Sequence, residues 1–176
     1  MDDEDAGQQR PDGTLECRPP TDVDLATLCR ELNLRGARYL VIGGFAIIAA
    51  GLPRTTGAID LLVASDLENE RKVFGALETL PDRAVQELEA GELERYNVIR
   101  VADEILVDLM TSAGGITYDR AASEAVVRTL EGVPIPFAST ALLWRMKKVT
   151  HRAKDAEDLL FLRNWFADRG LEPPRD

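Results

Sequence analysis

The sequence predicts an α/β protein with a small mixed β-sheet, flanking helices and a helical C-terminal third. Three observations lead to this fold class. Short apolar segments with strand character alternate with helical patterns in the first two thirds of the chain. One of these strands ends abruptly at a glycine pair, directly before a helical pattern. After residue 139, two helical patterns follow one another without a strand between them.

The elements before residue 81 have recognisable boundaries. Thr21 and Asp24 have the spacing of a capping box, and the apolar stripe from Leu25 to Leu32 predicts a helix to about Arg35. Cys29 lies on this stripe, so we expect a buried thiol. The next elements are a strand over 38–42, a helix over 45–50, a strand over 59–64 and a helix from Ser65 or Asp66 to about Leu80.

The second half of the chain is less regular. Residues 81–94 are acidic and poorly patterned, whereas 96–101 and 105–111 predict a hairpin. Because Gly132 and Pro134 interrupt a β-branched segment, we expect an edge hairpin over 126–136. The remaining predictions are a glycine loop at 114–115, a helix near 118–125, and helices over 139–151 and 154–167.

The N-terminal segment differs in composition from the rest of the chain. Residues 1–16 contain six acidic residues and one basic residue, Arg10, in a protein of 176 residues with a formal net charge of −10. Since the segment is almost without apolar side chains, we expect a flexible acidic tail over 1–20 and one domain over 21–176. The acidic balance argues against a general nucleic-acid coat protein, but the acid-free stretch 145–154 leaves a local basic groove open.

The composition also excludes several functional classes. The chain has two cysteines and one histidine, too few for the four ligands of a usual structural zinc site, and a hydrolase triad would depend on His151 alone. No apolar run approaches the length of a membrane span, and the N-terminus is acidic, unlike a signal peptide. We therefore expect a cytoplasmic protein without a membrane partner.

The candidate functional residues lie near the ends of the first strands. Gly43 and Gly44, at a helix start, leave backbone N–H groups open to an anion. Asp60 points to the same sheet face as position 58, and Asp108 lies inside an apolar strand, where an unpaired charge costs several kcal/mol. Two strands that each hold an inward-facing acid can form a divalent-metal site for phosphoryl or nucleotidyl transfer.

Each of these features also has a purely structural interpretation. The glycine pair can simply end a strand, and Asp60 can be a salt-bridge partner. Asp108 can pair with Arg54 or Arg100. The basic residues of the stretch 145–154 can form a solvated surface, held in place by the acids that follow it.

The pattern as a whole resembles the nucleotidyltransferase superfamily with the polymerase-β-like fold, in particular its AbiEii-like, toxin-type branch. The resemblance covers about residues 36–165 and implies a nucleotidyltransferase that binds a nucleoside triphosphate and two Mg²⁺ ions. Such an enzyme transfers a nucleotidyl group to a hydroxyl acceptor, which can be an RNA end, a protein or a small molecule. The resemblance implies catalytic and metal-binding roles for Asp60 and Asp108, and nucleotide contacts from Gly43, Gly44, Arg54, Thr56, Lys147 and Arg152.

One position departs from the family pattern. Ala58 stands where the family has its first metal-binding aspartate, and a methyl group cannot ligate Mg²⁺. Because loss of a shared metal ligand lowers the rate by orders of magnitude, we expect an inactive or strongly impaired chain. A natural loss and an engineered one both fit this sequence. The alternative is a non-catalytic binding module or an antitoxin-like regulatory protein with the same fold, and a toxin-type protein would also imply an antitoxin partner.

Overall fold

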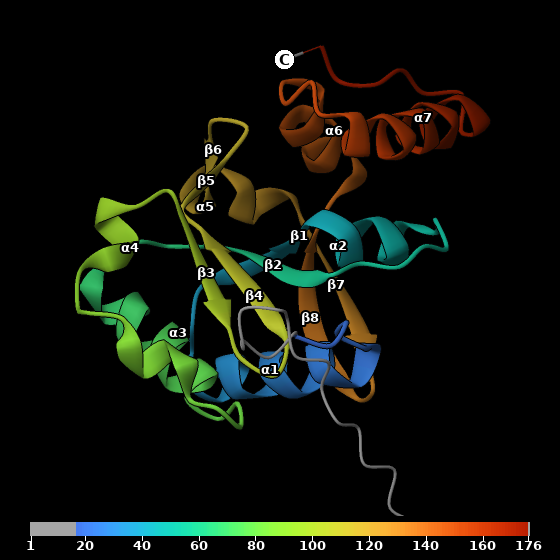
Figure 1. The fold of residues 1–176 in the computed structure, drawn as a ribbon. Helices are drawn as coiled ribbons and strands as arrows, with labels where there is room; N and C mark the ends of the chain where they lie inside the picture. The colour runs from blue at the N-terminus through green and yellow to red at the C-terminus, as the bar shows by residue number, and fades with distance from the viewer. Residues whose placement is uncertain (1–16, 176) are drawn as a thin grey trace, which may run out of the picture.

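The computed structural model describes residues 17–175, which form a mixed six-stranded sheet flanked by helices (Figure 1). The strand order is β3-β4-β2-β1-β8-β7. The pairs β1/β8 and β2/β4 are parallel, and the other neighbours are antiparallel. The strands are β1 (Tyr39–Ile42), β2 (Ala58–Val63), β3 (Val98–Ala102), β4 (Leu106–Met110), β7 (Ala125–Leu130) and β8 (Val133–Ala138). The predicted fold class is confirmed.

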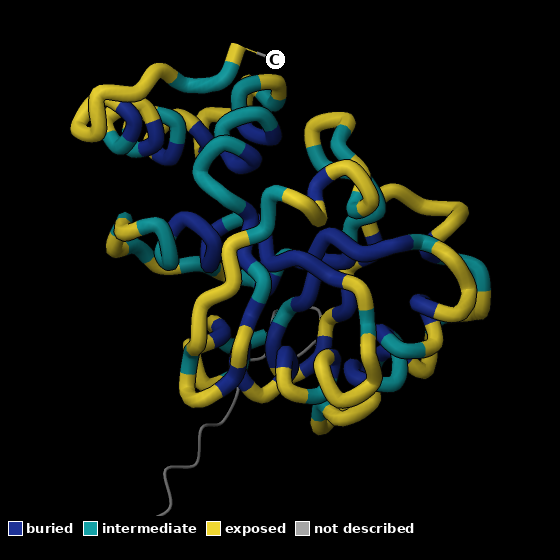
Figure 2. Tube along the Cα trace, turned by 180° about the vertical axis from the view of Figure 1, so that it is seen from behind, coloured by how far each residue is buried: buried dark blue, intermediate teal, exposed yellow. Residues whose placement is uncertain are grey.

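The helices lie on both sides of the sheet. Figure 1 shows α1 (Asp22–Leu34) and α3 (Leu67–Leu77) below the sheet, and α2 (Gly43–Ala50) above it with the C-terminal pair α6 (Thr140–Lys148) and α7 (Ala153–Asp168). Buried residues run through the strands between these layers, as Figure 2 shows. Short elements complete the described chain: η1 (Ala84–Glu87), α4 (Glu92–Arg95), the hairpin β5 (Ser112–Ala113) and β6 (Ile116–Thr117), α5 (Tyr118–Ala121) and η2 (Ala122–Glu124).

Local sequence accounts for the start of the domain. Thr21 caps α1, and the reciprocal contact from Asp24 completes the predicted capping box. Cys29 is fully buried on the apolar face of α1, and burial raises the pKa of its thiol to about 12. This thiol therefore packs as a small apolar group.

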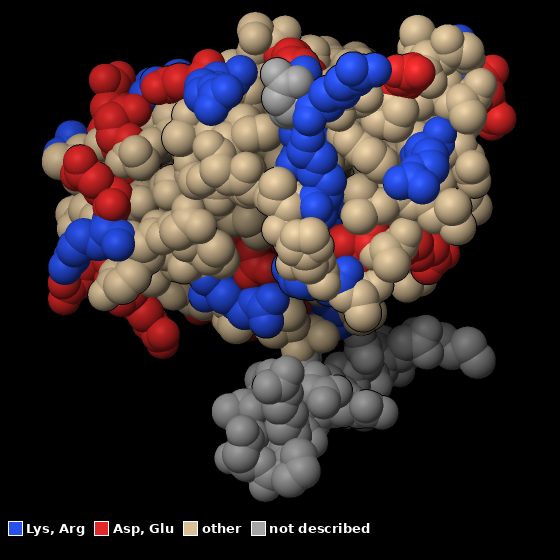
Figure 3. Space-filling model, turned by 90° about the horizontal axis from the view of Figure 1, so that it is seen from above, with Lys and Arg blue, Asp and Glu red and all other residues tan. Residues whose placement is uncertain are grey.

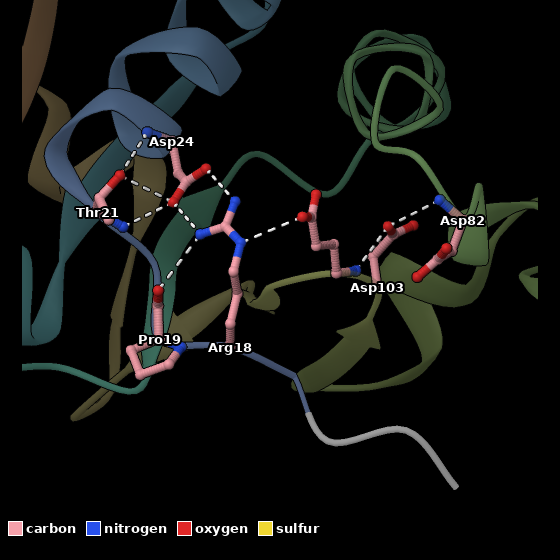
Figure 4. A network of polar contacts seen from close by, with 7 residues as sticks. Arg18, Pro19, Thr21, Asp24, Asp82 and Asp103 are labelled. Carbon is pink, nitrogen blue, oxygen red and sulfur yellow. Dashed lines mark hydrogen bonds and ion pairs between the residues drawn. The ribbon is translucent and has the colours of Figure 1, made fainter. Parts of the chain in front are cut away.

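The chain segment before α1 is held by a polar network (Figure 4). The guanidinium of Arg18 donates to both carboxylate oxygens of Asp24, at 2.6 and 2.7 Å, and to Glu104 at 3.2 Å. The backbone N–H of Arg18 donates to the carbonyl of Glu104 in the β3–β4 turn. Ordered contacts therefore begin before residue 20, where the sequence predicts the tail to end; residues 1–16 of that tail lie outside the described residues.

The predicted edge hairpin is confirmed, because β7 and β8 pair as an antiparallel hairpin at one end of the sheet. β7 does lie on an edge, but β8 lies inside the sheet between β7 and β1. Two prolines are tolerated there because β8 pairs with β1 at a single register position, Val41 with Phe137, beyond both prolines. The carbonyl of Pro134 instead accepts a hydrogen bond from the Asn33 side chain at 2.8 Å.

No helix within residues 17–175 is long and apolar enough to cross a membrane.

Candidate functional site

Two aspartates from neighbouring parallel strands form the centre of the candidate site. β2 and β4 pair with Asp60 directly opposite Asp108, so both side chains lie on the same face of the sheet. Asp108 is buried and Asp60 is half-buried. The alternation of the two strands thus brings together the two acids that the sequence singles out.

The environment of this acid pair favours a bound proton. Burial and the adjacent Asp108 carboxylate raise the pKa of Asp60 to about 7, against the opposing charges of Lys147 and Lys154. Asp108 has a second partner, because Arg100 on β3 is its register neighbour. The Nε and Nη2 atoms of Arg100 donate to the two carboxylate oxygens of Asp108 at 2.9 and 3.0 Å. Of the two ion pairs considered for Asp108, the structure forms the one with Arg100.

The glycine pair lies directly against this site. Gly43 has a φ of +67°, and a Cβ built on it would lie 2.0 Å from Oδ2 of Asp60. A Cβ on Gly44 would lie 2.4 Å from Oγ1 of Thr56 and 3.2 Å from Nη2 of Arg54. Both positions therefore require glycine so that these side chains can approach the start of α2. Ile42, the N-cap of α2, supplies no side-chain hydrogen bond to the helix.

The predicted nucleotide-contacting cations form an ion cluster with two buried aspartates of α7. Nζ of Lys147 lies 3.1 Å from Asp155 and 3.0 Å from Asp158, and all three residues are buried. Arg54 donates to Asp158 at 3.1 Å, and Arg152 to Asp155 at 2.8 Å. Burial disfavours the charge on Asp155, but hydrogen bonds from its neighbours, including Thr150 at 2.6 Å, together lower its pKa.

One pocket of about 660 Å³ joins these parts. All nine residues predicted from the sequence line it: Gly43, Gly44, Arg54, Thr56, Ala58, Asp60, Asp108, Lys147 and Arg152. Figure 3 looks onto the face that carries α6 and α7 and shows basic side chains beside a few acidic ones in a hollow. The structure adds Arg100, Lys154, Asp155 and Asp158 to the lining. The two α7 aspartates lie three residues apart on the helix. From the sequence, both were interpreted as supports of the basic loop, and Asp155 also as a ligand contact.

The donor set fits one divalent ion better than two. No group of three or more metal-binding side chains occurs among residues 17–175. Ala58 opens β2, pairs with Leu106 and lines the pocket two residues before Asp60, so its methyl group faces the place of a third carboxylate. Mg²⁺ is commonly held by one or two carboxylates together with ligand phosphates and water. The residues present therefore match a single ion shared with a phosphate ligand, not the two-ion site of the predicted family.

Three solved structures are similar to this chain. A nucleotidyltransferase-like antigenic protein from Paracoccidioides brasiliensis is similar at a TM-score of 0.50 and 16% identity, covering 83% of this chain and 75% of that one. A putative nucleotidyltransferase from Thermotoga maritima gives 0.44 and 16%, covering 82% and 91%. The antibiotic-resistance factor ANT(2'')-Ia gives 0.46 and 17%, covering 82% and 85%.

At 16% identity, the similarity to the Paracoccidioides brasiliensis protein shows a nucleotidyltransferase-like fold and nothing more. The chemistry has to be inferred from the residues of the pocket. No protein-family model matches the chain, and no curated protein matches it. The toxin-type branch stays a prediction from the sequence.

Proposed function

We propose that this pocket binds a nucleoside triphosphate together with one Mg²⁺ ion, and that nucleotidyl transfer to a hydroxyl acceptor is strongly impaired. The observation that carries the proposal is the register of Asp60 and Asp108 beside the glycine pair and the cation cluster, within one pocket. A fold without such a pocket would give no reason to infer a nucleotide ligand.

The pocket offers donors suited to phosphate oxygens. Nε of Arg54 is buried and has no hydrogen-bond partner among the described residues, which is costly unless a ligand satisfies it. Backbone N–H groups at the start of α2 add the positive end of a helix. Arg152 and Lys154 are exposed on the lining, so their charges can reach a ligand without leaving the protein surface.

The acids would have separate roles. Asp60 would hold the metal, and Asp108, fixed by Arg100, would share it or orient an acceptor hydroxyl. The bound ion would neutralise phosphate charge during transfer. With Ala58 in place of the first carboxylate, the second ion lacks a shared ligand, and the loss of several kcal/mol of transition-state stabilisation corresponds to orders of magnitude in rate.

A second function has its own supporting observation. Arg100 covers both oxygens of Asp108, and Ala58 removes a ligand, so the site keeps anion-binding cations while it loses metal-binding capacity. This combination favours a binding module that retains the fold without the reaction, for example an antitoxin-like regulator. An acceptor or protein partner would then respond to nucleotide occupancy alone.

Nucleotide titrations with and without Mg²⁺ test the proposal. Isothermal titration calorimetry with the four ribonucleoside triphosphates should show binding that Mg²⁺ strengthens. Ala58→Asp restores a carboxylate on the pocket face and should strengthen the Mg²⁺-dependent part by about tenfold or more, because the ion gains a ligand. Ala122→Asp introduces the same charge at an exposed position outside the pocket lining and serves as the matched control.

Activity separates the two functions. A transfer assay with labelled nucleotides should show little product with the unmodified chain and more with Ala58→Asp if the chain is a disabled transferase. Nucleotide binding with no product from either chain would favour the binding module. Absence of nucleotide binding in all three proteins would refute the proposed function.

A further inference from the structure

We infer that a second pocket, next to the nucleotide pocket, binds the phosphate group of an acceptor molecule. This side pocket has a volume of about 510 Å³ and is lined by the tip of the β5–β6 hairpin, the α5–η2 segment and α6. The inference rests on the proposed function, because it names the chemical class of a molecule bound beside the nucleotide. It concerns the binding of this molecule, with or without transfer.

The hairpin tip joins the side pocket to the nucleotide pocket. Gly114 lines both pockets. It has a φ of +56°, and a Cβ built on it would lie 2.8 Å from the Cα and from the carbonyl oxygen of Met146 in α6. Glycine therefore lets the tip lie against the backbone of α6, at the end of the molecule that carries the C-terminal helices (Figure 1). A molecule in the side pocket would thus lie next to a nucleotide in the first pocket.

The side pocket carries an excess of positive charge. Its charged lining residues are one acid and three cations: Glu124, Arg120, Arg145 and Lys148. Arg145 neutralises the acid, because its Nη1 atom donates to both carboxylate oxygens of Glu124 at 2.8 and 2.9 Å. Arg120 is exposed and forms no ion pair with any residue of 17–175, and Lys148 donates there only to the carbonyl of Arg175, at 3.0 Å. Two cations of the lining are therefore left without an acidic partner in the described chain.

These two cations favour an anionic occupant. In a chain with a formal net charge of −10, a pocket with excess positive charge attracts anions locally and repels cations. Arginine and lysine side chains are both suited to phosphate oxygens, which they contact through charged hydrogen bonds. The lining also contains Ile116 and Val149, whose apolar surface can contact the carbon skeleton of an organic phosphate. The side pocket therefore favours an acceptor that carries phosphate, from a small phosphate ester or from an oligonucleotide, and disfavours a polycationic acceptor.

Titrations followed in ¹⁵N spectra of the full-length protein locate the binding of defined probes. The phosphate probes are ribose 5-phosphate and a single-stranded hexaribonucleotide, and spermidine is the polycationic probe. A phosphate probe should shift the backbone amide of Gly115, which lines only the side pocket, and spermidine should not. The amide of Gly57, which lines only the nucleotide pocket, reports binding to the other pocket. A response to ribose 5-phosphate would identify a small ester as sufficient, and a response to the hexaribonucleotide alone would identify an oligonucleotide.

Variants with matched charge changes test the two unpaired cations. The test variant carries Arg120→Gln and Lys148→Gln, and the control carries Arg30→Gln and Arg71→Gln, two exposed arginines outside both pocket linings. At low salt, the dissociation constant of the phosphate probe should rise about tenfold or more in the test variant, because two charged donors are lost, whereas the control should bind as wild type does. A third variant, Arg120→Lys with Lys148→Arg, keeps both charges and should retain most of the affinity.

The outcomes separate this inference from the proposed function. Binding at Gly115 that requires Arg120 and Lys148, without nucleotide binding in calorimetry, would support the side pocket while refuting the proposed function. Nucleotide binding without a Gly115 shift from either phosphate probe would overturn this inference alone. Equal probe affinities of the test variant and wild type would overturn it too, as would shifts at Gly57 only or a Gly115 shift caused by spermidine.

Discussion

An Asp60→Asn substitution should remove most of the pH dependence of stability that the acid pair confers between about pH 5 and about pH 8. The pKa of Asp60 is about 7 in the folded protein and 3.8 in the unfolded chain. Over this interval the folded state keeps a proton that the unfolded chain has released. The stabilising contribution is therefore complete below the unfolded pKa and is lost as the pH rises through the folded pKa.

The size of the change in unfolding free energy follows from the pH range between 5 and the folded pKa of Asp60. Each pKa unit corresponds to about 1.4 kcal/mol, so the two units between pH 5 and the folded pKa amount to about 2.7 kcal/mol of unfolding free energy. Asparagine has nearly the shape of the protonated acid and keeps a donor towards Asp108. The variant should thus match wild type below the unfolded pKa of 3.8, and its advantage over wild type should grow by roughly 2–3 kcal/mol between pH 5 and pH 8.

Urea denaturation at both pH values measures the difference, and Asp24→Asn provides a control with the opposite behaviour. Hydrogen bonds from Arg18 lower the pKa of Asp24 to about 2, so its contribution is present above pH 4 and is lost only in stronger acid. That variant should lose stability equally at both pH values and keep the wild-type difference between them. An Asp60→Asn protein with the wild-type pH dependence would show that the two carboxyl groups do not share a buried site.

Four further outcomes follow from the site. Gly43→Ala should unfold about 1–3 kcal/mol more easily than Gly36→Ala in urea, because both glycines have φ +67° but only at Gly43 would the new Cβ meet a side chain, that of Asp60. Lys147→Met should lower the unfolding free energy by about 3–5 kcal/mol, since two buried aspartates of α7 lose their shared cation. Arg18→Gln should cost about 1 kcal/mol by thermal unfolding, and less in high salt. Near pH 8, Mg²⁺ should raise the melting temperature of wild type but not of Asp60→Asn.

Local patterns in the sequence were sufficient for most of the fold. The capping box of Thr21 and Asp24 predicts the start of α1, and the alternation around Asp60 and Asp108 predicts which face each acid occupies. Each of these sequence signals lies within a few residues of the structural feature that it predicts. Alternation does not determine register, however: the direct opposition of the two acids depends on β2 and β4 aligning without a slip.

The parts that sequence reasoning missed depend on contacts between distant segments. The edge hairpin was predicted, but the sequence did not show which of its strands faces β1; Pro134 and Pro136 are tolerated on the inner strand because β8 pairs with β1 at a single position. The pairing of Asp158 with Arg54 joins α7 to the loop before β2, and neither segment contains a local signal of the other. The spacing of Asp155 and Asp158 on one helix face was the available hint, because two buried acids on one helix require partners.

The energetics of the site support the proposal that the pocket binds a ligand. Placing Asp60 against Asp108 destabilises the folded state at neutral pH, and Gly43 is held in a left-handed conformation that leaves room for that carboxylate. A structural role for this face of the sheet would be met more stably by apolar residues, which remove the buried charges and the need for Arg100. Arrangements that lower stability concentrate at functional sites. Ala58 removes only one donor from this arrangement and leaves its unfavourable parts in place, which supports the proposed function of nucleotide binding with strongly impaired transfer.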